Sequence, residues 1–117
     1  MSEIAGIEVA VDQNVIYAAA SGEIDMSNSR MIARDLTAAV PNDAVGLVLD
    51  LTDVEYLDSS AVQIMFELAE RLEARQQRLV FVVPDDSPLQ RMLRVVSLDD
   101  AAPVVATREQ AESMLSA

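Results

Sequence analysis

The sequence contains no cysteine and no histidine, and all 8 of its basic residues are arginine. Without cysteine there are no disulfides, no thiolate nucleophiles and no cysteine-ligated metals. Without histidine there is no Ser-His machinery, and without lysine there is neither a P-loop lysine nor a Schiff base. Carboxylates, hydroxyls, 2 tyrosines and the arginines remain. An enzyme is possible with these residues, but it would have few catalytic groups to use.

Positive charge is also scarce, since the formal net charge is −12 at pH 7. A chain this acidic is repelled by the nucleic-acid backbone and by anionic membrane surfaces. No apolar run approaches the roughly 20 residues of a membrane span, and no signal peptide begins the sequence. The expectation is a cytoplasmic protein with no nucleic-acid partner and no membrane insertion. A basic surface patch is the natural complement in a partner.

Aromatic residues make up 3% of the chain and hydrophobic residues 51%. The core must therefore be aliphatic, and this much apolar sequence argues against disorder. A length of 117 residues fits a single domain, 1–117.

The hydrophobic pattern alternates between strand-like and helix-like segments. Strands are expected at 7–11, 15–20, 45–51, 79–83 and 103–106. Helices are expected from Ser27 or Asn28 to Val40, from Ser60 to about Arg75, from Pro88 to Val96, and at 107–115. A turn at 12–14 pairs the first two strands as a hairpin, and SGEIDMSNS after them is expected to be a polar loop. Strands joined through helices form a mostly parallel sheet, so the fold class is α/β with an antiparallel edge strand.

Three of the expected helices begin with the same pattern, a hydroxyl residue followed three positions later by glutamine. The pairs are Ser60 with Gln63, Ser87 with Gln90, and Thr107 with Gln110. Each matches a capping box, in which the two side chains bond reciprocally to the backbone of the first turn. Pro88 would then occupy the favoured first helical position.

The segment DVEYLDSSAVQ at 53–63 places an aspartate and two serines where a strand gives way to a helix. Ser60 as a helix cap, with Asp58 near the positive helix end, accounts for two of them. Ser59 is not required by that interpretation. It follows the carboxyl end of a strand, where α/β sheets gather reactive groups. A phosphate on Ser59 would meet helix N–H donors but also Asp58, so we expect little change in fold and a large change in surface potential.

The stretch VLDLTDVEYLDSSAVQIM resembles the signature of STAS domains, specifically of the small bacterial anti-sigma factor antagonists. SGEIDMSNS is similar to the Gly-Glu-Leu-Asp loop of that family, and LVFVVPDDSPLQRMLRVVSLDD to its late strand, loop and helix. The resemblance runs over nearly the whole chain. It implies a single STAS domain.

The resemblance also implies a function. In that family the serine after the aspartate is phosphorylated by an anti-sigma factor that is a serine kinase; here that residue is Ser59. Asp58 and Asp25 match acidic residues of the family pattern, so Asp25, Asp58, Ser59 and Ser60 are the expected partner-binding residues. The unphosphorylated form would bind the kinase and release the sigma factor, phosphorylation would end binding, and a serine phosphatase would restore it. The kinase would bring the ATP, so the resemblance implies a protein that is a substrate and a switch, is not itself an enzyme, and carries no cofactor or metal.

Two positions depart from the family pattern. Ala61 stands where glycine usually follows the serines, and Ser97-Leu98 replaces a Gly-Leu pair. Alanine at 61 would be strained if that position has positive φ and harmless if it is helical.

Other functions remain open. STAS domains also serve as non-phosphorylated modules in transporters, lipid-transport complexes and stress-sensing assemblies. Asp50 follows an apolar strand as the phosphoacceptor of a receiver domain would, but the lysine of such a site is absent. A carboxylate enzyme is also conceivable, and clustered acidic residues could bind Mg²⁺. The residues concerned are Asp25, Asp50, Asp53 and Asp58, and a solvated acidic rim is the simpler interpretation for them. Arg91 and Arg94 could meet an acidic partner, and a solvated helix face is preferred for them.

Overall fold

The computed structural model describes residues 6–116. Its strands are β1 (Gly6–Asp12), β2 (Val15–Ile24), β3 (Gly46–Leu57), β4 (Arg78–Val82) and β5 (Val104–Val105). Its helices are α1 (Ser29–Ala39), α2 (Ser59–Ala74), α3 (Gln90–Val96) and α4 (Arg108–Leu115), with a short 3-10 turn at Leu98–Asp100. The expected order of elements is confirmed.

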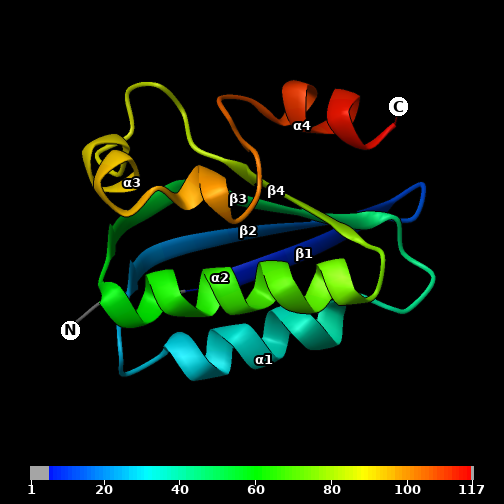
Figure 1. Cartoon of the computed structure of the whole chain (residues 1–117), viewed down its shortest axis with the longest axis horizontal. Coiled ribbons are helices and arrows are strands. Elements are labelled where there is room, and N and C mark those ends of the chain that lie inside the picture. The colour runs from blue at the N-terminus through cyan, green and yellow to red at the C-terminus, as the bar shows by residue number, and fades with distance from the viewer. Residues whose placement is uncertain (1–5, 117) are drawn as a thin grey trace.

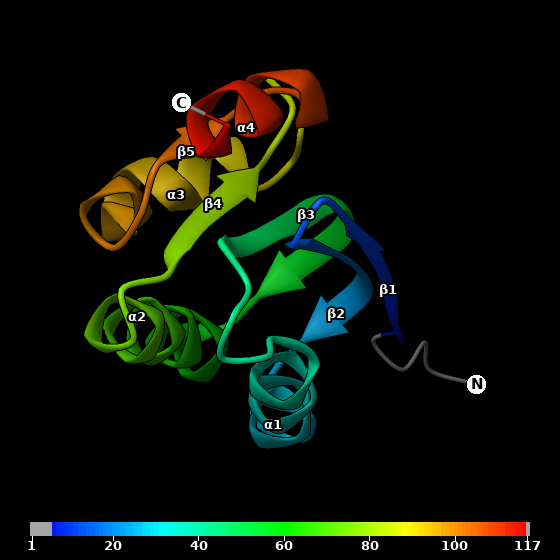
Figure 2. The ribbon, with the colours of Figure 1, turned by 90° about the vertical axis from the view of Figure 1, so that its right-hand side faces the viewer.

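The strands form one sheet in the order β1-β2-β3-β4-β5. β1 is antiparallel to β2, and the other neighbouring pairs are parallel. The predicted α/β class with an antiparallel edge strand is therefore confirmed. Figure 1 shows α1 and α2 running side by side along the sheet. Figure 2, turned by 90°, shows α4 across the sheet from them.

The two faces of the sheet are covered unequally. Along β3, Leu47 and Leu49 point into the larger core, which α1, α2 and α3 cover, whereas Val48 points to the other face. That second face has a smaller core, mainly under α4. The buried members of this smaller core are Tyr17, Val48, Val80, Val82, Ala111 and Leu115. Burial on both faces explains the nearly continuous apolar runs of the central strands.

β2 and β3 continue further than their apolar patterns predict. Residues 21–24 belong to β2 rather than to the polar loop, and residues 52–57 belong to β3. They stay paired through two register shifts, which break the strict alternation of buried and exposed residues. Gly22 lies at one shift with φ of 85°, a conformation that favours glycine. The strands end together at the pair Ile24 and Leu57, so the segments that follow them start side by side.

One of the three expected capping boxes is present. Thr107 and Gln110 bond reciprocally at the start of α4. The prediction for Ser87 and Gln90 is wrong, because Gln90 donates instead to the carbonyl oxygens of Val83 and Pro84, at 3.1 and 3.0 Å. α3 begins only at Gln90, so Pro88 lies before the helix.

The two departures from the family pattern differ in consequence. Ala61 is buried within α2 and is absent from the residues with positive φ, so alanine fits there. Ser97 ends α3 with φ of 54° and ψ of 50°, the left-handed region that glycine adopts more easily.

No helix in residues 6–116 is both long and apolar enough to cross a membrane.

Candidate functional site

The candidate site lies at the carboxyl end of the sheet, where β2 and β3 stop. The loop 25–28 leads from β2 into α1, and Asp58 leads from β3 into α2. Two hydrogen bonds join these segments: the Asp58 N–H donates to the Ile24 carbonyl oxygen at 3.2 Å, and the Met26 N–H donates to Asp58 Oδ2 at 3.0 Å. Residues more than 30 positions apart in the sequence are thereby fixed against each other.

Asp58, rather than Ser60, caps α2, so the predicted cap is wrong. The Asp58 backbone is extended, and its Oδ1 accepts from the Ala61 N–H at 3.0 Å. The Ser60 hydroxyl donates to the same oxygen at 2.5 Å. An aspartate directly before the first helical residue is a strong cap, which leaves Ser60 within the first turn. The Ser60 side chain supports the cap instead of providing it.

Hydrogen bonds hold the pKa of Asp58 below its ordinary value. The largest contribution comes from the Ser60 hydroxyl; burial acts in the opposite direction, and the N–H groups of Ala61 and Met26 add to the lowering. These donors stabilise the ionised carboxylate. Asp58 is therefore a fixed negative charge at neutral pH.

The loop before α1 is held by its own polar side chains. Asp25 Oδ1 accepts from the Ser27 N–H at 2.9 Å, and Asn28 Oδ1 accepts from the Asp25 N–H at 3.0 Å. The Asn28 amide nitrogen donates to the Glu23 carbonyl oxygen at 2.9 Å. Asn28 precedes α1, as expected, but its side chain turns back to the loop and makes no cap hydrogen bond. Asp25 and Asn28 thus define the conformation of the loop.

The structure brings the four predicted residues to one end of the molecule. Ser59 is the first residue of α2 and is exposed, whereas Asp58 and Ser60 are half-buried and bonded to each other. Asp25 is half-buried in the neighbouring loop. Ser59 is thus the more exposed of the two serines. A binding or phosphorylation role for these residues stays a prediction.

Sequence reasoning missed Met26. This residue is 79% exposed, while its N–H donates a hydrogen bond to Asp58. An apolar residue inside a polar loop was the available signal. Exposed single apolar residues are common, but this one is bonded through its N–H to Asp58, the residue before Ser59.

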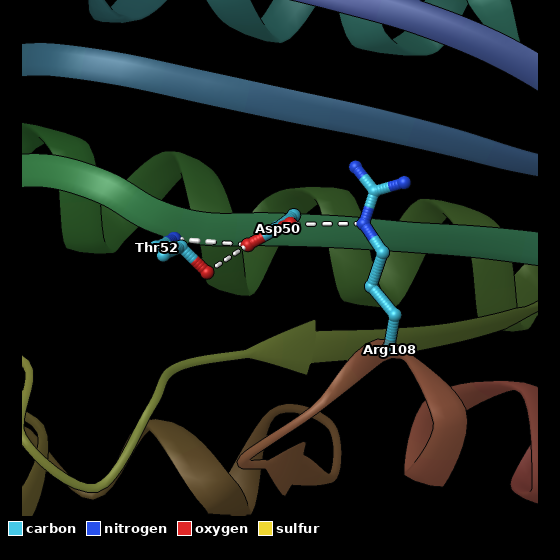
Figure 3. A network of polar contacts seen from close by, with 3 residues as sticks. All are labelled: Asp50, Thr52 and Arg108. Atoms are coloured by element: carbon cyan, nitrogen blue, oxygen red, sulfur yellow. Dashed lines mark hydrogen bonds and ion pairs between the residues drawn. The ribbon is translucent and has the colours of Figure 1, made fainter.

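Asp50 lies elsewhere, on the face of the sheet that α4 covers (Figure 3). Its carboxylate accepts from the Thr52 N–H at 2.9 Å and from the Thr52 hydroxyl, and Arg108 Nε donates to it at 3.0 Å. Burial raises the pKa of Asp50, but the bonds from Thr52 and Arg108 outweigh it and lower the pKa overall. The arginine also lies over the Tyr17 ring, 5.7 Å from its centroid. Asp50 thus links the sheet to α4 through Arg108. It is not placed as the exposed phosphoacceptor of a receiver domain would be.

The alternative of a magnesium site finds no support in the described part of the chain. Among residues 6–116, no three or more carboxylates lie close enough together to hold a metal ion.

Comparison with known proteins assigns the family. The model of the STAS domain matches residues 6–111. The chain belongs to the STAS domain family. No match was found among the curated proteins.

Solved structures share the fold. An anti-sigma factor antagonist from Mycobacterium paratuberculosis is 24% identical, with a TM-score of 0.86 and 100% of both chains covered. The antagonist SpoIIAA in its unphosphorylated form is 16% identical, with a TM-score of 0.73 over 94% of this chain and 96% of that one. The phosphorylated form of SpoIIAA, from Bacillus, is 19% identical, with a TM-score of 0.65 over 94% and 99% of the two chains.

Proposed function

We propose that this protein is an anti-sigma factor antagonist. Its unphosphorylated form binds an anti-sigma factor that is a serine kinase and thereby releases the sigma factor. Phosphorylation of Ser59 ends the binding, and a serine phosphatase restores it. The observation that carries the proposal is the exposed Ser59 at the first position of α2, beside a loop to which Asp58 is hydrogen-bonded.

The geometry suggests how a phosphate would act. In the first turn of α2, the Ala61 N–H is occupied by the Asp58 side chain and the Val62 N–H by the Asp58 carbonyl oxygen. A phosphate on Ser59 would therefore compete for donors that are already used, next to a carboxylate that repels it. It would add about −1.5 to −2 charges at the surface. We expect the fold to persist and the docking of the kinase to be lost through repulsion and desolvation.

The solved structures support a switch of this kind. SpoIIAA, whose phosphorylated and unphosphorylated forms have both been solved, shares the fold with this chain in either form. The proposed phosphoacceptor also occupies a place where added charge meets no buried side chain, since Ser59 is exposed.

The test is the intact mass of the protein after incubation with ATP and candidate anti-sigma kinases from the same cell. The wild type should gain one phosphate and Ser59→Ala none. Ser60→Ala is the matched control: it removes a hydroxyl one residue away that is bonded to Asp58, so it should still be phosphorylated. Phosphate on Ser59→Ala would contradict the assignment of the site.

Binding tests the second half of the proposal. Ser59→Asp should bind the unmodified kinase more weakly than the wild type does, because one carboxylate supplies part of the phosphate charge. Ser59→Asn is the neutral control of the same shape. Equal affinities of the two variants would contradict an electrostatic switch. Stable complexes without phosphorylation by any kinase would indicate a STAS module that does not switch.

A further inference from the structure

A groove of about 530 Å³ runs between α1 and α2 on the side away from the sheet. The two helices lie side by side in both views and start at the same end of the sheet (Figures 1 and 2). Their exposed sides form the walls, from Ser29 and Ser60 at one end to Thr37 and Arg71 at the other. The groove therefore begins next to Ser59 and continues along both helices.

The groove has an apolar floor and a basic rim. Ala33, Ile64 and Leu68 line it, and Ile64 and Leu68 are 8% and 4% exposed. Arg30 and Arg34, four positions apart on α1, project from the same side of that helix. Arg71 contributes a third guanidinium group from α2, and all three arginines are exposed.

The rim is positively charged in a strongly acidic protein. Three arginines and one acidic residue, Glu67, line the groove, whereas the whole chain has a net charge of −12. In residues 6–116 no carboxylate lies within 4.0 Å of these three arginines, since the ion pair found there joins Arg108 to Asp50. Their charge is thus available to a partner.

A second hollow provides an internal comparison. It measures about 450 Å³, and its charged lining residues are Asp85, Asp99 and Arg94, which sum to a negative charge. Of these two hollows, the groove between α1 and α2 is the one with an excess of positive charge.

We propose that the groove binds an acidic segment of a partner protein, with apolar side chains on the floor and carboxylates on the arginine rim. Charge complementarity selects the carboxylates, and the apolar floor selects a peptide rather than a simple anion. A long polyanion such as duplex DNA, or an anionic membrane, would also meet the surrounding acidic surface and be repelled. The inference does not depend on phosphorylation of Ser59.

The experiment selects short random peptides displayed on phage against the intact wild-type protein, then measures the affinity of the selected peptides by fluorescence anisotropy. Peptides that combine acidic and apolar residues should be enriched. The double variant Arg30→Glu with Arg34→Glu should bind them at least about tenfold more weakly, because attraction becomes repulsion. Both arginines are exposed, and glutamate at position 30 lies in the first turn of α1, where it suits the helix dipole, so this variant should fold.

A matched variant has Arg91→Glu with Arg94→Glu, which changes the net charge equally on the exposed side of α3. It should bind the peptides as the wild type does. Ala33→Phe tests the floor without a change of charge and should also weaken binding. Circular dichroism checks that each variant is folded.

Three results would overturn the proposal. The first is a set of selected peptides with no excess of acidic residues. The second is equal peptide affinity in the wild type and the Arg30/Arg34 variant. The third is binding to phosphatidylserine vesicles or duplex DNA, abolished by the same two substitutions, without binding of acidic peptides.

Discussion

Asp50 and Asp58 share a local arrangement and serve different purposes. Each accepts a hydrogen bond from a hydroxyl two residues later, at 2.5 Å in both cases, and from at least one backbone N–H. Each has a lowered pKa. Asp50 adds an ion pair to Arg108, whereas Asp58 adds the Met26 N–H from another loop. Asp50 therefore holds α4 against the sheet, whereas Asp58 helps to hold the loop of the candidate docking surface.

The largest effect is expected from Asp58→Ala. The variant loses the cap of α2 and the bond to the Met26 N–H, so its free energy of unfolding should fall by about 1–2 kcal/mol. Binding of the kinase should fall as well, since the loop before α1 loses its hydrogen bond to Asp58. Chemical denaturation and an affinity measurement check the two parts. Asp53→Ala, which removes an exposed aspartate of β3, should change neither.

Asp50 should behave differently. A double-mutant cycle of Asp50→Asn and Arg108→Met should give a coupling of at most about 1 kcal/mol, the upper range for ion pairs near the surface. The side chain of Arg108 is 46% exposed and that of Asp50 13%, so solvent weakens the pair. Affinity for the kinase should stay unchanged. If Asp50→Asn lost affinity for the kinase without losing stability, the different roles assigned to Asp50 and Asp58 would be contradicted.

Acid should reveal both carboxylates. Their pKa values in the folded protein lie below the ordinary 3.8, so each stabilises the fold fully above that pH. This contribution is lost as the pH falls through the lowered values. The free energy of unfolding, measured by denaturation at a series of pH values from neutral down to about pH 3, should fall with decreasing pH. Below about pH 4 this fall should be less steep for Asp58→Asn and Asp50→Asn than for the wild type. If the free energy of unfolding of the variants had the same pH dependence as that of the wild type, the lowered pKa values of Asp50 and Asp58 would be contradicted.

The smallest effect is expected from a change that touches neither aspartate. Ser97→Gly removes a side chain from a left-handed position and should stabilise the protein by about 0.5 kcal/mol, because relief of strain exceeds the added freedom of the unfolded chain. Thermal unfolding at neutral pH would detect it. Ala61→Gly is the contrasting control and should destabilise, since residue 61 is helical.

The sequence predicted the elements well because burial decides them. Continuous apolar runs correctly predicted the central strands, and apolar residues spaced three or four positions apart correctly predicted the helices. The ends of these elements were less predictable. Residues 52–57 of β3 were missed because register shifts interrupt the alternation. Ser60 and Asp58 both suited a cap by type, and the Met26 N–H that binds Asp58 is 32 positions away.

The candidate site shows the same limit. Its four residues were recognised from a local motif and a family resemblance, and the shared end of β2 and β3 explains why they meet. The arginines of the groove were not recognised. Arg30 and Arg71 are far apart in sequence, and only the packing of α1 beside α2 places them on one rim. The candidates considered instead, Arg91 and Arg94, lie exposed on α3.

The order of strands in the sheet also bears on how the chain is made. Each strand pairs with the strand before it in the sequence. During synthesis on a ribosome, every new strand would thus find its neighbour already outside the exit tunnel, and no strand would have to wait for a later one to be inserted between them. The sheet can grow from one edge to the other in the direction of translation, with α4 closing the second face last.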